Sequence, residues 1–330
     1  MKVLSLFSGI GAFEKALERR NIKYELVNYC EIDAYSSKSY SLIHNVSEDY
    51  NLWDVTKVDT SKLPKDIDLI TYGFPCQDIS IAGFKKGLFN DDGTRTRSGL
   101  FFDALRIIED TKPKYAIAEN VKNLMSKSLN AQFQIILASL EAAGYNNYFK
   151  VLSGIDYGIP QNRQRVFIVS IRKDIDTGFT FPKPQKLKLK PIDLLEDEVD
   201  EKYYKICPSM IKAFEQGKIK DLTNADYANT LTTKMNRWNN CGMVYRKGRL
   251  SFLTPRESFR LMGFDDEDFD KIEGTISETQ LYKQAGNSII VNVLEHLFES
   301  LFSERKKEEL RVERVQEYTI FDFLNNKDAI

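Results

Sequence analysis

Short apolar runs that alternate with helical patterns constrain the fold of this chain more than any other feature. The runs lie at Val3–Phe7, Glu25–Tyr29, Asp68–Tyr72, Tyr115–Ala118, Tyr148–Leu152 and Val166–Ile171. Helical patterns lie between them at Phe13–Arg19, Phe101–Asp110 and Ala131–Ala143. Strands that alternate with helices build βαβ units around a mostly parallel sheet. Residues 1–173 therefore predict an α/β fold with helices flanking the sheet.

The sequence changes in character after Arg172, which predicts a second, smaller lobe. Phe181–Pro184 indicates a linker, and an acidic cluster follows at Glu196–Glu201. Regular strand–helix alternation is absent there, and helical patterning returns only near residue 277. We expect a large domain made of 1–173 and 277–303, a small domain over 174–276 inserted between its two pieces, and a charged, solvated tail over 304–330.

Composition excludes several classes of protein. Hydrophobic residues make up 42% of the 330, enough for a sizeable core, and the net charge of −1 indicates no partner by itself. The four cysteines have no C-x-x-C spacing and there are two histidines, so we expect no metal site. The N-terminus lacks a signal-peptide pattern, and no apolar run approaches the ~20 residues that span a bilayer. We therefore expect a cytoplasmic protein with no membrane partner.

A cysteine and a glutamate follow two neighbouring apolar runs. Cys76 comes directly after Gly73–Pro75, and Glu119 ends the run Ala116–Ala118. Residues at the carboxyl ends of parallel strands lie at the edge of the sheet where ligands bind. A nucleophile and an acid there are typical of covalent catalysis. The alternative, a buried inert cysteine with a capping glutamate, is the more common situation for a lone cysteine.

A glycine-containing turn follows the first apolar run and precedes a helix. Gly9 and Gly11 in this turn allow the backbone to approach a ligand closely. Glu31 lies 20 residues after Gly11, where a carboxylate can bind ribose hydroxyls. This arrangement also fits an NAD site, but Glu14 stands where the third glycine of G-x-G-x-x-G would be. Because S-adenosylmethionine has no pyrophosphate, it does not need that glycine.

Six short blocks resemble, in sequence and in order, the signature motifs of the DNA (cytosine-5) methyltransferases of bacterial and phage restriction-modification systems. The blocks are Leu6–Gly11, Gly73–Gln77, Glu119–Val121, Gln161–Arg165, Leu253–Glu257 and Gln284–Ser288. They extend over nearly the whole chain to about Phe302, and six blocks in the family's order rarely arise by chance. The resemblance implies a Rossmann-like methyltransferase sheet with an inserted target-recognition domain.

The resemblance also implies a binding pocket for S-adenosylmethionine, which would leave as S-adenosylhomocysteine. In this family Phe7 would stack on the adenine, Glu31 would bind the ribose with Ile32 beside the base, and Asp54 would accept from the adenine amino group. The implied cofactor residues are Phe7, Gly9, Ile10, Gly11, Glu31, Ile32, Asp54, Val55, Pro75, Leu100, Asn287 and Ser288.

The implied reaction is methyl transfer to C5 of a cytosine that is flipped out of double-stranded DNA. Cys76 would add to C6, Glu119 would bind N3 and the exocyclic amine, and Arg163 and Arg165 would flank the site. Ordinary surface charges are the alternative for the two arginines. Gln77 and Ser80 are implied DNA contacts, and the Gly-rich segment Ser80–Gly99 would close over DNA.

A stretch rich in cations suggests where DNA is read. Between residues 231 and 260, seven Lys or Arg stand against one acid, Glu257. The expected DNA contacts are Thr230, Leu231, Lys234, Arg237, Arg246 and Arg249. A solvated surface is the alternative. We expect the small domain to read a short sequence, and the chain to act as a monomer, with any cognate restriction endonuclease acting separately.

Three other functions remain as alternatives. The tRNA-methylating branch of the family shares these blocks, but its Cys-Phe-Thr triplet is absent from the target region. A catalytically silent DNA-binding relative is opposed by the presence of Cys76, Glu119 and Arg165. A nicotinamide-dependent oxidoreductase is opposed by the missing third glycine.

Overall fold

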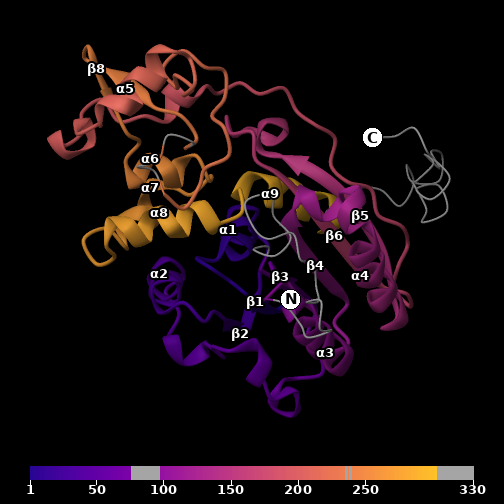
Figure 1. Cartoon of the computed structure of the whole chain (residues 1–330). Helices are drawn as coiled ribbons and strands as arrows, with labels where there is room; N and C mark the ends of the chain where they lie inside the picture. Colours follow the sequence, from indigo (N-terminus) through magenta and orange to yellow (C-terminus); the bar gives the residue numbers. More distant parts are fainter. Residues whose placement is uncertain (76–96, 235–236, 238–239, 303–330) are drawn as a thin grey trace.

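The computed structural model describes residues 1–75, 97–234, 237 and 240–302. The expectations for Cys76, Gln77, Ser80, most of the segment up to Gly99 and the tail over 304–330 lie outside the described residues. Helices and strands are coloured along the chain in Figure 1.

The core of the protein is a six-stranded sheet. Its strands are β1 (Lys2–Leu6), β2 (Glu25–Cys30), β3 (Leu69–Tyr72), β4 (Tyr115–Val121), β5 (Tyr145–Ser153) and β6 (Gln164–Arg172). They are arranged in the order β2-β1-β3-β4-β6-β5. The pairs β1–β2, β1–β3 and β3–β4 are parallel, whereas β6 runs antiparallel to both β4 and β5. The predicted mostly parallel α/β sheet is confirmed, and all six predicted strands are present.

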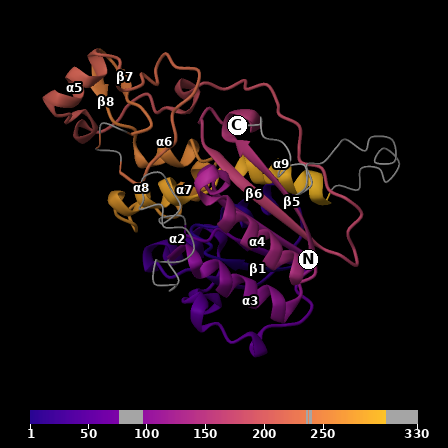
Figure 2. The ribbon, with the colours of Figure 1, turned by 45° about the vertical axis from the view of Figure 1, so that its right-hand side comes forward.

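Helices cover both faces of the sheet. The helices of this part are α1 (Ala12–Arg19), α2 (Ala34–His44), α3 (Phe101–Thr111) and α4 (Asn130–Ala142). Alternate strand residues point to opposite sides, so Val3 packs in the cluster that contains α1, and Leu4 packs in the cluster that contains α3 and α4. Figure 2 shows α3 and α4 side by side on their face of the sheet. Burial on both faces explains why the strands are continuous apolar runs.

The remaining elements follow the sheet in sequence. They are α5 (Pro208–Glu215), β7 (Val244–Arg246), β8 (Arg249–Ser251), α6 (Pro255–Arg260), α7 (Asp266–Asp270), α8 (Glu278–Asn287) and α9 (Val291–Phe302). Strands β7 and β8 form a two-stranded antiparallel sheet, which lies with α5 far from the main sheet in Figure 1. Helix α9 returns to the main sheet and packs on α1. We call residues 174–276 the insert.

Helix α2 was not among the predicted helices. Four of its eleven residues are serines, and Ser36, Ser37 and Ser39 are buried, so the usual apolar stripe is missing. Asp33 caps the helix by accepting a hydrogen bond from the Ser36 backbone N–H. In the part of the chain that the structure describes, no helix has both the length and the apolar character needed to cross a bilayer.

Candidate active site

The predicted site residues of the large domain gather at one edge of the sheet. The strands β2, β1, β3 and β4 are parallel neighbours, so their carboxyl ends point the same way. Glu31 follows β2, Phe7 follows β1, Gly73 follows β3, and Glu119 lies near the end of β4. Segments far apart in the sequence therefore contribute to a single surface.

Glu119 and Arg165 form an ion pair across the antiparallel strands β4 and β6. The Arg165 Nε lies 3.0 Å from the Glu119 Oε1, and the Glu119 side chain is only 12% exposed. Burial raises the pKa of Glu119, and the positive charges of Arg165 and Arg163 oppose this shift. The site thus contains a carboxyl group that keeps its proton to a higher pH than an ordinary glutamate.

The end of β3 is fixed against the end of β4. The buried side chain of Asn120 donates a hydrogen bond from Nδ2 to the Phe74 carbonyl at 3.0 Å. Phe74 is itself buried, and a Cβ on Gly73 would lie 3.7 Å from the Glu119 Oε2. The backbone that leads to Cys76 is therefore held close to the carboxyl group of Glu119.

The turn after β1 forms a tight backbone loop. Phe7, Gly9 and Gly11 have φ values of 54°, 58° and 80°, in the left-handed region that favours glycine. The Gly9 N–H donates to the Glu31 Oε2 at 2.8 Å, and the Asp33 N–H donates to the Glu31 Oε1 at 2.8 Å. Burial raises the pKa of Glu31, and these two hydrogen bonds oppose the shift. We call residues 7–11 the glycine loop.

Asp54 and Ile32 lie near the end of β2 but differ in their surroundings. The Asp54 Oδ1 accepts hydrogen bonds from the backbone N–H and hydroxyl of Thr56, which lower its pKa. Ile32 is 71% exposed and Trp53 is 42% exposed, so apolar surface faces outward here. Val55, by contrast, is buried in the core. Exposed apolar side chains beside a carboxylate are suited to a flat heteroaromatic ring.

A small cavity lies between the glycine loop and Glu119. Its lining includes a residue from β4, residues around β1 and the block at the end of α8. The lining residues are Phe7, Ser8, Gly9, Ile10, Ala12, Phe13, Ser36, Gly73, Glu119, Gln284, Asn287, Ser288 and Ile289. A Cβ added to Gly9 would meet no described atom within 4 Å, so the backbone there is open to a ligand. Of the twelve residues predicted to bind the cofactor, five line this cavity (Phe7, Gly9, Ile10, Asn287 and Ser288) and seven do not (Gly11, Glu31, Ile32, Asp54, Val55, Pro75 and Leu100).

The expected catalytic role of Arg163 does not agree with its position. Its side chain is 4% exposed and donates to three backbone carbonyls, those of Leu231, Gly286 and Ser288, at 2.7 to 3.1 Å. Arg163 therefore ties the start of β6 to the insert and to the end of α8. The positive charge of Arg163 still opposes the rise in the Glu119 pKa that burial causes.

Two further residues of this junction were not predicted as functional. Buried Gln161 donates to the Leu261 carbonyl at 2.7 Å and accepts from the Leu231 N–H at 2.8 Å. Buried Gln284 lines the cavity and bonds to the Ser39 hydroxyl at 2.9 Å. Each is the first residue of one of the six sequence blocks, so membership in a block was the sequence feature that could have identified them.

Two residues of the insert that were predicted to contact DNA are buried, so the prediction is wrong for both. Leu231 is 1% exposed and packs in the core, because its backbone is bound by Gln161 and Arg163. Arg246 is 6% exposed and forms an ion pair with Glu257, which is fully buried. Neither side chain is placed to touch DNA. Thr230 is half-buried and its hydroxyl donates to the Asn162 carbonyl at 2.7 Å.

The cations of the insert differ in how far they are neutralised. Arg249 is exposed but makes a double hydrogen bond to Glu201 and stacks on Tyr204. Lys247 pairs with Glu198. Lys234 and Arg237 are exposed, and neither forms an ion pair with any described residue. The excess of positive charge seen in the sequence is thus largely cancelled, because Arg246 pairs with Glu257, Lys247 and Arg249 pair with acids of 196–201, and Arg256 and Arg260 pair with acids of 266–273.

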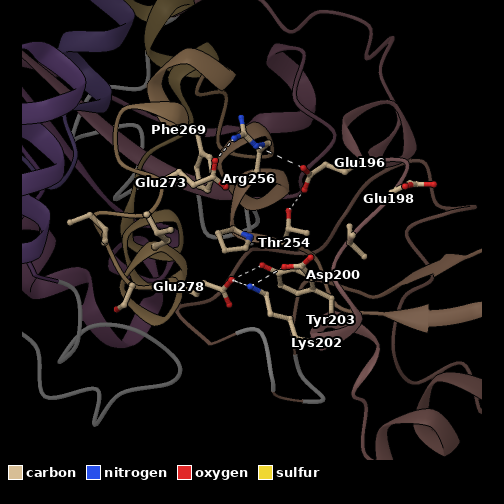
Figure 3. Close-up of a pocket in the computed structure, with 16 residues that line it drawn as sticks. Glu196, Glu198, Asp200, Lys202, Tyr203, Thr254, Arg256, Phe269, Glu273 and Glu278 are labelled. Atoms are coloured by element: carbon tan, nitrogen blue, oxygen red, sulfur yellow. Dashed lines mark hydrogen bonds and ion pairs between the residues drawn. The ribbon is translucent and has the colours of Figure 1, made fainter.

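A second cavity lies between residues 196–203 of the insert and helices α6 to α8 (Figure 3). Arg256 lies over the Phe269 ring and pairs with Glu273. On the other side, Lys202 and Tyr203 both bind the Glu278 carboxylate. Five acidic residues line it (Glu196, Glu198, Asp200, Glu273 and Glu278). Because phosphates are repelled by such a lining, this cavity is not suited to the DNA backbone. Among the described residues, no group of three His, Cys, Asp or Glu is placed to hold a metal ion.

Comparisons with known proteins agree with this geometry. The family model for C-5 cytosine-specific DNA methylases matches residues 1–303. The type II methyltransferase M2.ScrFI of Lactococcus lactis subsp. cremoris is 37% identical over 92% of this chain and 99% of that protein. The orphan methyltransferase M.SPRI of Bacillus phage SPR is 31% identical over 91% of this chain and 97% of that protein.

The fold is also similar to that of solved structures. The Entamoeba histolytica methyltransferase EhMeth superimposes with a TM-score of 0.75 at 20% identity, covering 93% of this chain and 99% of that one. At this level of identity the similarity concerns the fold. With the family model matching more than nine-tenths of its length, this chain belongs to the family of C-5 cytosine-specific DNA methylases.

Proposed function

We propose that this enzyme transfers a methyl group from S-adenosylmethionine to C5 of a flipped-out cytosine in a short duplex DNA sequence, with Cys76 as the nucleophile. The observation that carries this proposal is the cavity lined by both the glycine loop and Glu119. In this cavity a methyl donor and a target base would lie next to each other, at the carboxyl ends of the strands.

The residues around the glycine loop fit S-adenosylmethionine. Phe7 and exposed Ile32 offer apolar surface for the adenine, and Glu31 is fixed by two backbone N–H groups beside the loop. Asn287 and Ser288 close the opposite side of the cavity. When bound, S-adenosylmethionine supplies an electrophilic methyl group on a sulfonium sulfur. The residues of the pocket would bind it so that this methyl group faces the place of the target base.

Cys76 would act at C6 of the target base. It follows Pro75, and the hydrogen bond from Asn120 to Phe74 fixes the backbone two residues earlier. Addition of the Cys76 thiolate to C6 of cytosine makes C5 nucleophilic, so C5 can take the methyl group. Loss of the C5 proton and release of Cys76 complete the reaction.

Glu119 would stabilise the ring while the thiolate adds. Its raised pKa supports a protonated carboxyl group that donates to N3 of the cytosine, where negative charge develops. The Arg165 guanidinium at 3.0 Å holds the carboxyl group in position. Arg163 acts as a positioning residue, because its hydrogen bonds hold the Leu231, Gly286 and Ser288 carbonyls in place.

The insert would read the DNA sequence. We take 174–276 as the target-recognition domain, with the large domain over 1–173 and 277–303. Exposed Lys234 and Arg237 are the phosphate or base contacts that its charge distribution supports. The Thr230 hydroxyl donates to the carbonyl of Asn162, two residues before β6. This hydrogen bond fixes the part of the insert that leads to Lys234.

The relatives suggest a biological role. M2.ScrFI bears the name of a type II methyltransferase, and M.SPRI that of an orphan methyltransferase. We propose the type II role, in which methylation protects the host's DNA from a separate cognate endonuclease. The methyltransferase itself would act as a monomer.

Bisulfite sequencing of DNA from a methylation-free host that expresses this chain tests the proposed activity. The expected result is methylated cytosine at one short sequence, and none with a Cys76→Ser variant. Bisulfite sequencing of tRNA from the same cells is the second arm. Methylated tRNA with unmodified DNA would overturn the proposed substrate.

A further inference from the structure

The last residue of α2, His44, lies directly under the glycine loop. Its side chain is 1% exposed. Its Nε2 lies 3.1 Å from the Ile10 carbonyl oxygen, in the middle of the loop, and its Nδ1 lies 3.0 Å from the Glu18 Oε1 on α1. The ring therefore connects the loop to the helix that follows it. His44 is 34 residues from Ile10 in sequence and belongs to none of the six blocks.

The loop and the ring are packed together closely. A Cβ on Gly11 would lie 2.0 Å from the His44 Nε2, so any side chain at position 11 would displace the ring. The other side of the ring packs on Tyr40, with ring centroids 4.7 Å apart, and Tyr40 stacks on Tyr29. His44 thus has a single fitted position, from which it contacts the turn at Ile10 and Gly11.

Both ring nitrogens face oxygens that accept hydrogen bonds. The Ile10 carbonyl can only accept. The hydrogen bond with His44 lowers the pKa of Glu18 against the opposing effect of burial, so Glu18 is an ionised acceptor. The Tyr24 hydroxyl also donates to the Glu18 Oε1, at 3.0 Å. A neutral imidazole can donate to only one of the two oxygens, whereas an imidazolium can donate to both.

Charged and ionisable groups surround the ring. From α1 the ring faces Glu18 and the buried Glu14, and from α2 it faces Tyr40. Lys271, after α7, donates to the neighbouring Ile43 carbonyl, and Lys15 acts on Glu18. Burial raises the pKa of Glu14, which leaves Glu18 as the ionised partner of the ring.

We propose that His44 is a positioning residue that holds the glycine loop in the shape that binds S-adenosylmethionine. The inference rests on the proposed role of the loop as the cofactor site. It implies that cofactor affinity falls when the ring is replaced, because the Ile10 carbonyl and the Glu18 carboxylate then lose the group that joins them.

The test is calorimetric binding of S-adenosylhomocysteine to the full chain. His44→Ala removes both contacts of the ring and should weaken binding on the order of tenfold, as expected for the loss of a buried hydrogen bond. His44→Gln keeps a donor that can reach one of the two oxygens, and its dissociation constant should lie between those of the wild type and of His44→Ala.

The second histidine provides a matched control. His296 lies on α9 and does not line the cavity, so His296→Gln should bind S-adenosylhomocysteine as the wild type does. In steady-state kinetics, His44→Gln should raise the KM for S-adenosylmethionine without lowering kcat at saturation.

Three outcomes separate the possibilities. Wild-type affinity for S-adenosylhomocysteine in His44→Ala would overturn the positioning role. Equal losses in melting temperature and in DNA binding, with no change in KM for S-adenosylmethionine, would assign His44 to the fold alone. Failure of the wild type to bind S-adenosylhomocysteine at any pH would instead overturn the proposed cofactor site.

Discussion

Arg165 Nε lies 3.0 Å from the Glu119 Oε1, and the two residues come from neighbouring antiparallel strands. Residue 119 pairs with Phe167, and residue 165 with Val121, so the register places the two side chains diagonally at one end of the sheet. This pair fixes the position of the acid at the proposed site, while the charge of Arg165 opposes the rise in the Glu119 pKa that burial causes.

The first prediction concerns the pH dependence of the reaction. Burial raises the pKa of Glu119, so its protonated form persists above the ordinary range and is lost as the pH rises through the raised value. If protonated Glu119 donates to N3, kcat should fall along that alkaline limb. Glu119→Gln cannot titrate, and should lose this limb together with about 10²–10⁴-fold in kcat. A limb that persists in Glu119→Gln would show that another group titrates.

Cofactor binding should depend on the two carboxylates near the end of β2. Glu31→Ala removes the acceptor of the Gly9 and Asp33 N–H groups as well as the ribose contact, and Asp54→Ala removes the adenine contact. Each loss should weaken binding of S-adenosylhomocysteine by about 1.5–3 kcal/mol. DNA affinity measured without cofactor should change little. Unchanged calorimetric affinity in both variants would contradict the proposed pocket.

Arg163 should matter for stability more than for chemistry. Arg163→Ala would leave the Leu231, Gly286 and Ser288 carbonyls without their donor in a buried junction. The free energy of unfolding should fall by about 3 kcal/mol or more. Arg165→Ala, whose side chain is partly exposed, should cost less stability but more activity. Denaturant titration beside kcat measurement separates the two, and the reverse ranking would contradict these roles.

DNA binding should depend on the cations of the insert that are not neutralised. Lys234→Ala and Arg237→Ala should each weaken binding, and a phosphate contact should reduce the slope of log affinity against log salt by about one. Arg249→Ala is the matched control, because Glu201 already neutralises Arg249. Methylation of a randomised duplex library would show whether either variant also alters the site. If Lys234 and Arg237 variants behave like Arg249→Ala, DNA is read elsewhere in the insert.

The sequence predicted what depends on local pattern. The six strands were found because each is buried on both faces and forms a continuous apolar run, as Leu69–Tyr72 does. The positions of Glu31 and Glu119 followed from the strand ends. These features need no knowledge of which distant residues meet.

Features that depend on distant partners were missed. Helix α2 buries serines, and Ser39 finds its partner Gln284 from a position 245 residues later in the chain. Arg246 and Arg249 were expected on DNA because a count of charges along 231–260 does not show which acid pairs with which arginine. Glu257 is in that stretch and Glu201 is outside it, and only the fold brings each to its arginine. His44 lies in no block, and its contacts with Ile10 and Glu18 appear only in three dimensions.

The covalent step through Cys76 is the central claim. The most direct measurement uses duplex DNA with 5-fluorocytosine at the methylated position, incubated with enzyme and S-adenosylmethionine. Fluorine at C5 cannot leave as a proton does, so the enzyme should remain attached. We predict a denaturation-resistant complex with the wild type, with the adduct mapped to Cys76 by peptide mass spectrometry, and no complex with Cys76→Ser. A complex formed by Cys76→Ser, or an adduct mapped to Cys30, Cys207 or Cys241, would contradict the account.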